Sequence, residues 1–185
     1  MTAPMHVRPA AAADHGLIRR VVLDAFGPAE QVVGDLVEAL RAFPGTEPVE
    51  LVAEVDGELV GHVMLTRSLL DAPRRLIDVL VLSPLSVAPD HQRAGIGTAL
   101  VRAAVDAAAA AGAPLLFLEG DPGYYVRHGF VPGEPLGFRK PSLRIPDAAF
   151  QVVVLPSHES WMTGTLVYAW PFWALDCVGL RELDT

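Results

Sequence analysis

The feature that most constrains the fold is a strand–helix–strand run in the middle of the chain. An apolar strand is predicted over Ile77–Val87, an alanine-rich helix from about Gly97 to Ala111, and a short buried strand in the run PLLFL at 114–118. Gly112 and Pro114 are typical of the end of a helix. Two strands joined by a helix of this length predict a parallel βαβ unit with a right-handed crossover.

The flanking patterns complete an α/β domain. Asp14 is the predicted N-cap of a helix reaching about Ala25, and a second helix is expected from about Ala29 to Phe43, ending at Pro44-Gly45. The remaining predictions are strands at 7–9, 150–155 and 165–168, a hairpin over 49–68 that turns at Asp56-Gly57, and a polar loop at 71–75. No linker divides the pattern, so one domain over residues 1–185 is expected.

Composition narrows the function classes. The chain has 185 residues and a formal net charge of −8, which weighs against binding nucleic acid. An acidic surface suits a cationic substrate, although it also serves solubility alone. Cys177 is the single cysteine and the six histidines form no HxxxH or HExxH pair, so neither a disulfide within the chain nor a metal site is expected. Without a recognisable signal peptide or an apolar membrane span, a cytoplasmic protein is expected.

The stretch QRAGIG, at the start of the central helix, suits an anionic ligand. A helix start presents unpaired backbone N–H groups and a partial positive charge. Gly95 and Gly97 would let a ligand approach the backbone, Arg93 adds a charge and Thr98 a hydroxyl. A Rossmann fingerprint would need glycine where Leu100 stands, and a Walker loop would need Gly-Lys-Ser/Thr. The alternative is an ordinary strand–helix turn that contains glycine.

Two motifs resemble those of a known superfamily. QRAGIG after LSVAPDH resembles the Q/R-x-x-G-x-G/A acetyl-CoA signature of the GNAT N-acetyltransferases, and YVRHGF at 125–130 resembles their Tyr-x-x-x-Gly-Phe motif. The resemblance spans about Val7 to Tyr168, and SPLSVAPDHQ together with GDPGYYVRHGF is most similar to the YhbS-like acetyltransferases. It implies an α/β GNAT fold, in which a mixed central β-sheet with splayed parallel strands 4 and 5 is flanked by helices. Pro84 falls in the strand that carries a bulge in this fold.

The resemblance also implies acetyl-CoA as co-substrate and no metal. Backbone groups of Leu85 and Val87 would pair with the pantetheine arm, and the Val87 N–H would polarise the thioester carbonyl. The residues expected at the helix start, around the pyrophosphate, are Gln92, Arg93, Ala94, Gly95, Ile96, Gly97 and Thr98.

Tyr125 matches the family tyrosine that protonates the departing sulfur. A phenol can do this because it stays protonated at neutral pH. The general base is less clear. Many relatives carry Glu four residues before the valine that corresponds to Val87, whereas this chain has Ser83. A serine hydroxyl is not a base at neutral pH, so Ser83 could take part in removing the amine proton only by binding a water molecule. Glu119, Asp121 and His128 are further candidates, and the base stays unassigned.

The leading hypothesis is an acetyl-CoA-dependent N-acetyltransferase that moves an acetyl group to a primary amine by direct attack in a ternary complex. The alternative is a non-catalytic acyl-CoA-binding or regulatory module on the same fold, which Ser83 favours and Tyr125 opposes. A kinase-like phosphate-binding domain fits poorly, because no P-loop lysine is present. The amine acceptor is not specified. The aromatic C-terminal segment contains Trp161, Tyr168, Trp170, Phe172 and Trp173, and such a cluster is expected in the core, on the face of a homodimer or at the acceptor site.

Overall fold

The computed structural model describes residues 5–27 and 31–181. The described residues up to 66 form one compact unit with residues 82–107, and residues 67–81 form a second with those from 108 onward. The long strands β3 (Glu58–Asp71) and β4 (Leu76–Val87) contribute residues to both units. The expectation of a single domain over 1–185 stays a prediction.

The first unit is built on antiparallel strands. Its other strands are β1 (Met5–Pro9) and β2 (Val49–Val55). β1 pairs with β2 from Met5↔Val55 onward, and β2 pairs with β3 from Val49↔Leu65. Asp56 and Gly57 connect β2 to β3 with φ angles of 54° and 80°, the two positive values that a tight type I′ hairpin turn requires. The predicted hairpin and its turn are confirmed.

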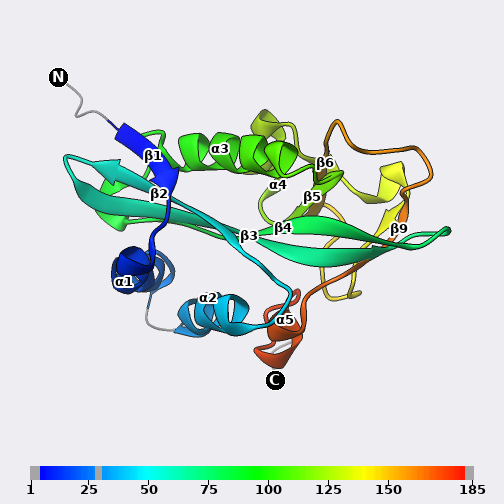
Figure 1. The fold of residues 1–185 in the computed structure, drawn as a ribbon, viewed down its shortest axis with the longest axis horizontal. Helices are drawn as coiled ribbons and strands as arrows, with labels where there is room; N and C mark the ends of the chain where they lie inside the picture. The colour runs from blue at the N-terminus through cyan, green and yellow to red at the C-terminus, as the bar shows by residue number, and fades with distance from the viewer. Residues whose placement is uncertain (1–4, 28–30, 182–185) are drawn as a thin grey trace. The chain divides into compact units, whose positions relative to one another are not determined.

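Three α-helices flank these strands. They are α1 (His15–Phe26), α2 (Gln31–Ala42) and α3 (Ile96–Ala110), with short 3₁₀ turns at Ala12–Asp14 and Pro89–His91. Figure 1 shows α1 and α2 on one side of β2 and β3, and α3 on the other. All three predicted helices are confirmed, although the predicted start of the second, at Ala29, lies outside the described residues.

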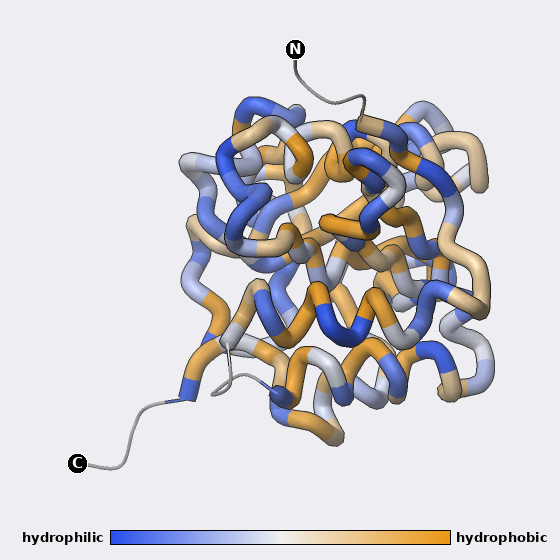
Figure 2. Tube along the Cα trace, turned by 90° about the vertical axis from the view of Figure 1, so that its left-hand side faces the viewer, coloured by the Kyte–Doolittle hydropathy of each residue, from blue (hydrophilic) through white to orange (hydrophobic). Residues whose placement is uncertain are grey.

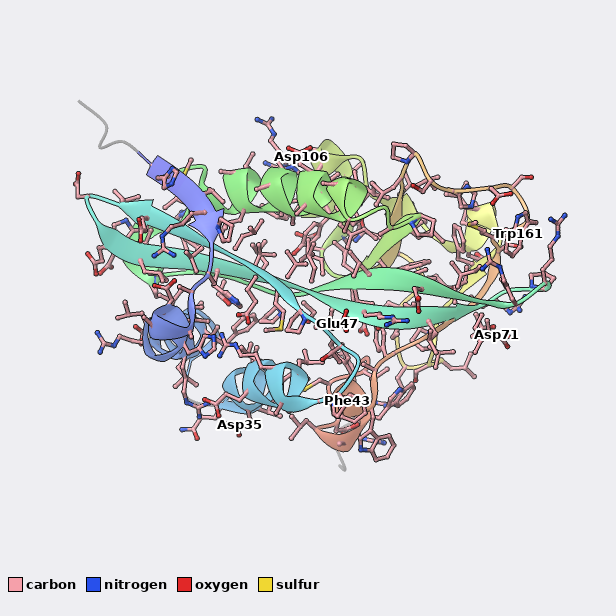
Figure 3. All side chains as sticks on the ribbon, viewed as in Figure 1. Asp35, Phe43, Glu47, Asp71, Asp106 and Trp161 are labelled. Atoms are coloured by element: carbon pink, nitrogen blue, oxygen red, sulfur yellow. The ribbon has the colours of Figure 1, made fainter. Side chains whose placement is uncertain are left out.

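The helices are amphipathic, so one face of each is buried. In α3, Leu100, Val101 and Ala104 are buried, whereas Asp106 is exposed and projects away from the strands (Figure 3). Hydrophobic and hydrophilic residues alternate in the same way along the helices in the lower half of Figure 2.

Gly61 lets α3 lie unusually close to β3. A Cβ atom at this position would lie 2.9 Å from Leu100 Cδ1, closer than real Cβ contacts, and 3.0 Å from Ile96 Cγ2, which is tighter than most of them. The Ile96 and Leu100 side chains, from the first turns of α3, therefore pack directly over Gly61. This contact fixes the height of the helix start above the strand.

The second unit contains the parallel pair. Its helices and strands are β5 (Leu115–Glu119), α4 (Pro122–Tyr125), β6 (Val131–Pro132), β7 (Phe138–Arg139), β8 (Phe150–Val154), β9 (Gly164–Val167) and α5 (Trp170–Ala174), with 3₁₀ turns at Val126–His128 and Glu134–Leu136. β5 pairs in parallel with β4 and antiparallel with β8, whose other neighbour is β6. β9 pairs antiparallel with β3 and in parallel with β7.

A cluster of phenylalanine rings forms the core of this unit. The Phe117 ring meets Phe138 edge-on at 5.3 Å and stacks on Phe150 at 5.6 Å, and all three side chains are fully buried. The mixed sheet, the parallel β4–β5 pair and the flanking helices confirm the predicted α/β class. The described pairs of β4 with β5 are Leu80↔Leu116 and Val81↔Phe117, and splaying of the two strands beyond them stays a prediction.

The structure corrects two local expectations. Asp14 precedes α1, but its carboxylate does not cap the helix; it accepts hydrogen bonds from Arg8 (2.7 and 3.1 Å) and from the Ala11 N–H (2.7 Å). The Arg8 hydrogen bonds are the main reason that the pKa of Asp14 falls to about 2. In addition, β3 continues to Asp71, so the polar loop expected from that residue is shorter.

Candidate active site

A turn that precedes α3, residues 92–95, forms the predicted glycine motif. Arg93 and Gly95 both take left-handed backbone conformations, with φ of 61° and 88°. A Cβ at Gly95 would meet nothing within 4 Å, so the space above this residue is open. Gln92, Arg93, Ala94 and Gly95 are exposed or nearly so, and Gly97 and Thr98 are half-buried. An exposed turn before a helix of 15 residues offers free N–H groups and a positive dipole end, which suits a phosphate group.

The side chains of two residues in the predicted cofactor set make contacts within the protein. The Ile96 side chain is buried against the β3 face at Gly61, which leaves only its backbone for a ligand. The Gln92 amide donates to the Val87 carbonyl at 3.1 Å and so holds the turn against the end of β4.

The end of β4 carries the residues expected to hold pantetheine. Leu85 and Val87 are half-buried, with the buried Ser86 between them. Val81 and Leu82 are neighbours and both buried, so burial changes phase between them, the pattern that a bulge produces. The Ser83–Pro84 peptide bond that follows is cis, and the Ser83 side chain is half-buried.

Tyr125 ends α4, whose N-terminus is capped by Asp121. The Asp121 carboxylate accepts from the Gly123 N–H at 2.8 Å. The Tyr125 ring covers Gly120, where a Cβ would lie 2.5 Å from Tyr125 Cε2, and it meets Phe130 at 5.7 Å. Burial, followed by the charges of Tyr124 and Asp121, raises the pKa of the Tyr125 phenol well above its usual value. The hydroxyl therefore stays protonated at neutral pH, as a proton donor requires.

Glu119, a candidate base, is engaged at both carboxylate oxygens. Its Oε1 accepts from the Tyr168 hydroxyl at 2.8 Å and its Oε2 from the Gly179 N–H at 3.0 Å. Burial raises the pKa of the Glu119 carboxyl, and these two hydrogen bonds act against the rise. The carboxylate thus holds the C-terminal segment in place.

Comparisons with known proteins identify the family. A GNAT acetyltransferase domain model matches residues 49–132. A similar solved structure is that of a GNAT family acetyltransferase from Brucella melitensis in complex with acetyl-CoA. The two sequences are 31% identical, and the match covers 92% of this chain and 99% of the Brucella chain with a TM-score of 0.73. The chain belongs to the GNAT family.

Two further relatives of this GNAT chain come from Escherichia coli. The uncharacterized N-acetyltransferase YjhQ is 34% identical over 116 residues, which is 62% of this chain and 63% of the relative's length. The structure of YhbS in complex with CoA matches with a TM-score of 0.81 over 93% of both chains. Because its identity is 23%, the likeness to YhbS shows the fold alone.

The aromatic C-terminal segment of this GNAT chain is divided between two environments. Tyr168 and Phe172 are buried with their rings 4.9 Å apart. Trp161, labelled in Figure 3, lies under the guanidinium groups of Arg74 and Arg75 at 5.0 and 5.5 Å, and Trp170 is 63% exposed. Tyr168 and Phe172 therefore belong to the core, whereas Trp170 is exposed and Trp161 and Trp173 are half-buried.

No group of three or more His, Cys, Asp or Glu side chains suited to a metal occurs among residues 5–27 and 31–181. In the same described ranges, no helix has both the length and the apolar character needed to span a membrane.

Proposed function

We propose that this chain is an acetyl-CoA-dependent N-acetyltransferase that moves an acetyl group to a primary amine by direct attack in a ternary complex. The observation that carries the proposal is the open, left-handed turn at Gly95 before α3. A relative that is 31% identical over 92% of this chain, and whose structure contains acetyl-CoA, supports the assignment of that turn to acetyl-CoA.

Each candidate residue has a chemical role in this proposal. The exposed Arg93 and the backbone N–H groups from Ala94 to Thr98 bind the pyrophosphate. Backbone groups of Leu85 and Val87 align the pantetheine arm and polarise the thioester carbonyl. Tyr125 protonates the departing sulfur, and Ser83 holds a water near the amine.

A non-catalytic acyl-CoA-binding module is the second candidate. The observation that favours it concerns the two carboxylates that precede Tyr125 in the chain and are candidates for the general base. Asp121 caps α4, and Glu119 accepts hydrogen bonds from Tyr168 and Gly179. Both oxygens of Glu119 and the Oδ1 of Asp121 are therefore already engaged within the protein. A panel of primary amines (ethanolamine, spermidine, glucosamine and trialanine) with acetyl-CoA and a thiol-release readout separates the two functions. Release that depends on an amine supports the enzyme, and binding without release supports the module.

Acetyl-CoA is expected to stabilise the folded protein. A ligand present at 100 times its Kd adds about 2.7 kcal/mol by linkage, which corresponds to a rise in Tm of about 5–10 °C for a chain of this size. Thermal unfolding with acetyl-CoA, ATP or NAD at equal concentrations measures the effect. ATP and NAD should shift Tm far less, and three equal shifts would contradict the acetyl-CoA assignment.

Replacing Gly95 with valine is expected to weaken acetyl-CoA binding at least tenfold, about 1.4 kcal/mol. The side chain fills the open space above the turn, where the phosphates are proposed to lie. Gly45→Val is the matched control, since Gly45 has a similar φ of 84° and equally open surroundings, but follows α2. Calorimetric titration gives both affinities. Unchanged affinity in a folded Gly95→Val variant would show that the turn has a structural role only.

A further inference from the structure

Three ionisable side chains lie in a row within the first unit, from α2 across β2 to β3. Arg41 Nε and Nη2 donate to the two oxygens of Glu50, each at 2.7 Å. His62 Nε2 lies 2.8 Å from Glu50 Oε2. The His62 side chain is 0% exposed and that of Glu50 is 9% exposed. Burying a charged group costs free energy unless the charge is paired. The protonation state of each of these groups therefore depends on its partners in the row.

The row contains a carboxylate and a neutral imidazole. Burial acts to raise the pKa of Glu50, but hydrogen bonds from Arg41 and His62 outweigh it and hold this pKa at about 2. Burial lowers the pKa of His62; Glu50 opposes this change, while the charges of Arg41 and His15 add to it. Because Glu50 can only accept, the His62 proton resides on Nε2. Nδ1 is then left as an acceptor with an available lone pair.

The strand next to β3 places a serine opposite His62. The Ala88 N–H donates to the Val60 carbonyl at 2.8 Å, which sets these two residues opposite each other in the antiparallel pair. Two residues further in, the same register places Ser86 opposite His62 on the same face, with Cβ atoms about 5 Å apart. The Ser86 hydroxyl and His62 Nδ1 are both buried and have no hydrogen-bond partner among the described residues. A donor and an acceptor, each unsatisfied, thus occupy adjacent positions.

The two ends of the row lie in different surroundings. Ser86 stands between Leu85 and Val87, the residues proposed to align pantetheine. At the other end, Arg41 lines a hollow of about 420 Å³ whose remaining lining residues are His15, Gly16, Arg19, Glu38 and Ala42. The row therefore joins the proposed acetyl-transfer segment of β4 to a hollow between α1 and α2.

We propose that Ser86, His62 and Glu50 form a proton relay that takes up the proton lost by the acceptor amine. The inference rests on the proposed acetyltransferase function. The amine nitrogen bonds to the acetyl carbon and the carbon–sulfur bond breaks. The amine passes one proton to the Ser86 oxygen, Ser86 passes its own proton to His62 Nδ1, and Tyr125 protonates the sulfur. The imidazolium is stabilised by Glu50 and releases its proton to solvent, from which Tyr125 recovers one.

The test compares His62→Gln and Ser86→Ala with wild type. Glutamine can still bond to Glu50 but cannot take up a proton, and alanine removes only the hydroxyl. Thr66→Val is the matched control, because Thr66 is also a fully buried β3 residue whose hydroxyl has no partner among the described residues. Turnover is measured by thiol release with acetyl-CoA and whichever of ethanolamine, spermidine, glucosamine or trialanine wild type acetylates. Both relay variants should lose about 10²–10³-fold in kcat. Their acetyl-CoA thermal shifts and the kcat of Thr66→Val should stay near wild type.

The pH profile separates a relay from a structural role. With saturating amine, wild-type kcat should decrease as the pH is lowered, because a protonated His62 cannot accept a proton. The midpoint of this decrease should lie below pH 6.5, the ordinary pKa of histidine, because burial lowers the pKa of His62. In His62→Gln this acid limb should be absent.

Wild-type kcat and an unchanged acid limb in His62→Gln would overturn the relay while leaving the acetyltransferase intact. If His62→Gln does not fold, Ser86→Ala decides: a kcat equal to that of Thr66→Val overturns the relay, and a kcat at least 10²-fold lower supports it. A wild-type protein that binds acetyl-CoA but acetylates no amine in the panel would overturn the proposed enzyme and the relay together.

Discussion

The Tyr125→Phe variant is expected to lose about 10²–10⁴-fold in turnover while acetyl-CoA affinity changes little. The ring keeps its contacts with Gly120 and Phe130, so packing is preserved and only the hydroxyl is removed. Burial keeps that hydroxyl protonated in the wild-type protein, which makes it available to a departing thiolate. Thiol release at saturating acetyl-CoA and amine measures the loss, and calorimetry measures the affinity.

Tyr124→Phe provides the control for this experiment. Its ring lies 4.9 Å from that of Tyr125, so the variant removes a hydroxyl from the adjacent ring. We expect it to retain most of the wild-type turnover. Full activity in Tyr125→Phe would show that solvent protonates the sulfur, and it would remove Tyr125 from the catalytic residues.

The largest loss of stability is expected from Gly164→Ala. Gly164 has a φ of 144°, in a region that is almost restricted to glycine, and a Cβ there would lie 2.0 Å from the Asp71 carbonyl oxygen. The clash is with backbone, at the point where β9 pairs with β3, so no side-chain rotation relieves it. Overpacking and backbone strain together predict a loss of about 2–6 kcal/mol in the free energy of unfolding. Urea or thermal unfolding measures this loss.

Gly16→Ala is the matched control for the same measurement. Gly16 lies in the first turn of α1, where a Cβ meets nothing within 4 Å, and alanine favours a helix over glycine by up to about 1 kcal/mol. The two glycine-to-alanine changes should therefore shift stability in opposite directions. A Gly164→Ala variant as stable as wild type would mean that β9 can leave β3 without cost.

The regular part of the fold was predictable because its signals are local. The spacing of apolar residues located α1 and α2, and the alanine-rich run before Gly112 and Pro114 located α3. The Asp-Gly pair located the turn between β2 and β3, and the apolar run at 114–118 located β5. The short elements had no such signal. α4, β6 and β7 have two to four residues each, too few to show a period. β6 and β7 exist through pairing with the distant strands β8 and β9, and α4 is held by local hydrogen bonds to Asp121.

Some residues of the candidate site were also predictable from local sequence, and others were not. The glycine turn and Tyr125 lie in continuous motifs, so the amino-acid sequence alone indicates both of them. The row from Arg41 to Ser86 could not be found in this manner, because Glu50, His62 and Ser86 are separated by 12 and 24 residues and meet only through strand register. The Asp14 expectation was wrong for a related reason: a cap motif does not reveal that Arg8 competes for the carboxylate.

The closeness of α3 to Gly61 has a consequence for protein engineering. The Ile96 and Leu100 side chains leave little room above Gly61, so a methyl group at position 61 would push against their ends, and unless both side chains rotate away the start of α3 would be lifted. The N–H groups of the first turn would be lifted with it. An attempt to redesign the turn for an anion of another size therefore has to keep glycine at position 61, even though Gly61 lies outside the turn.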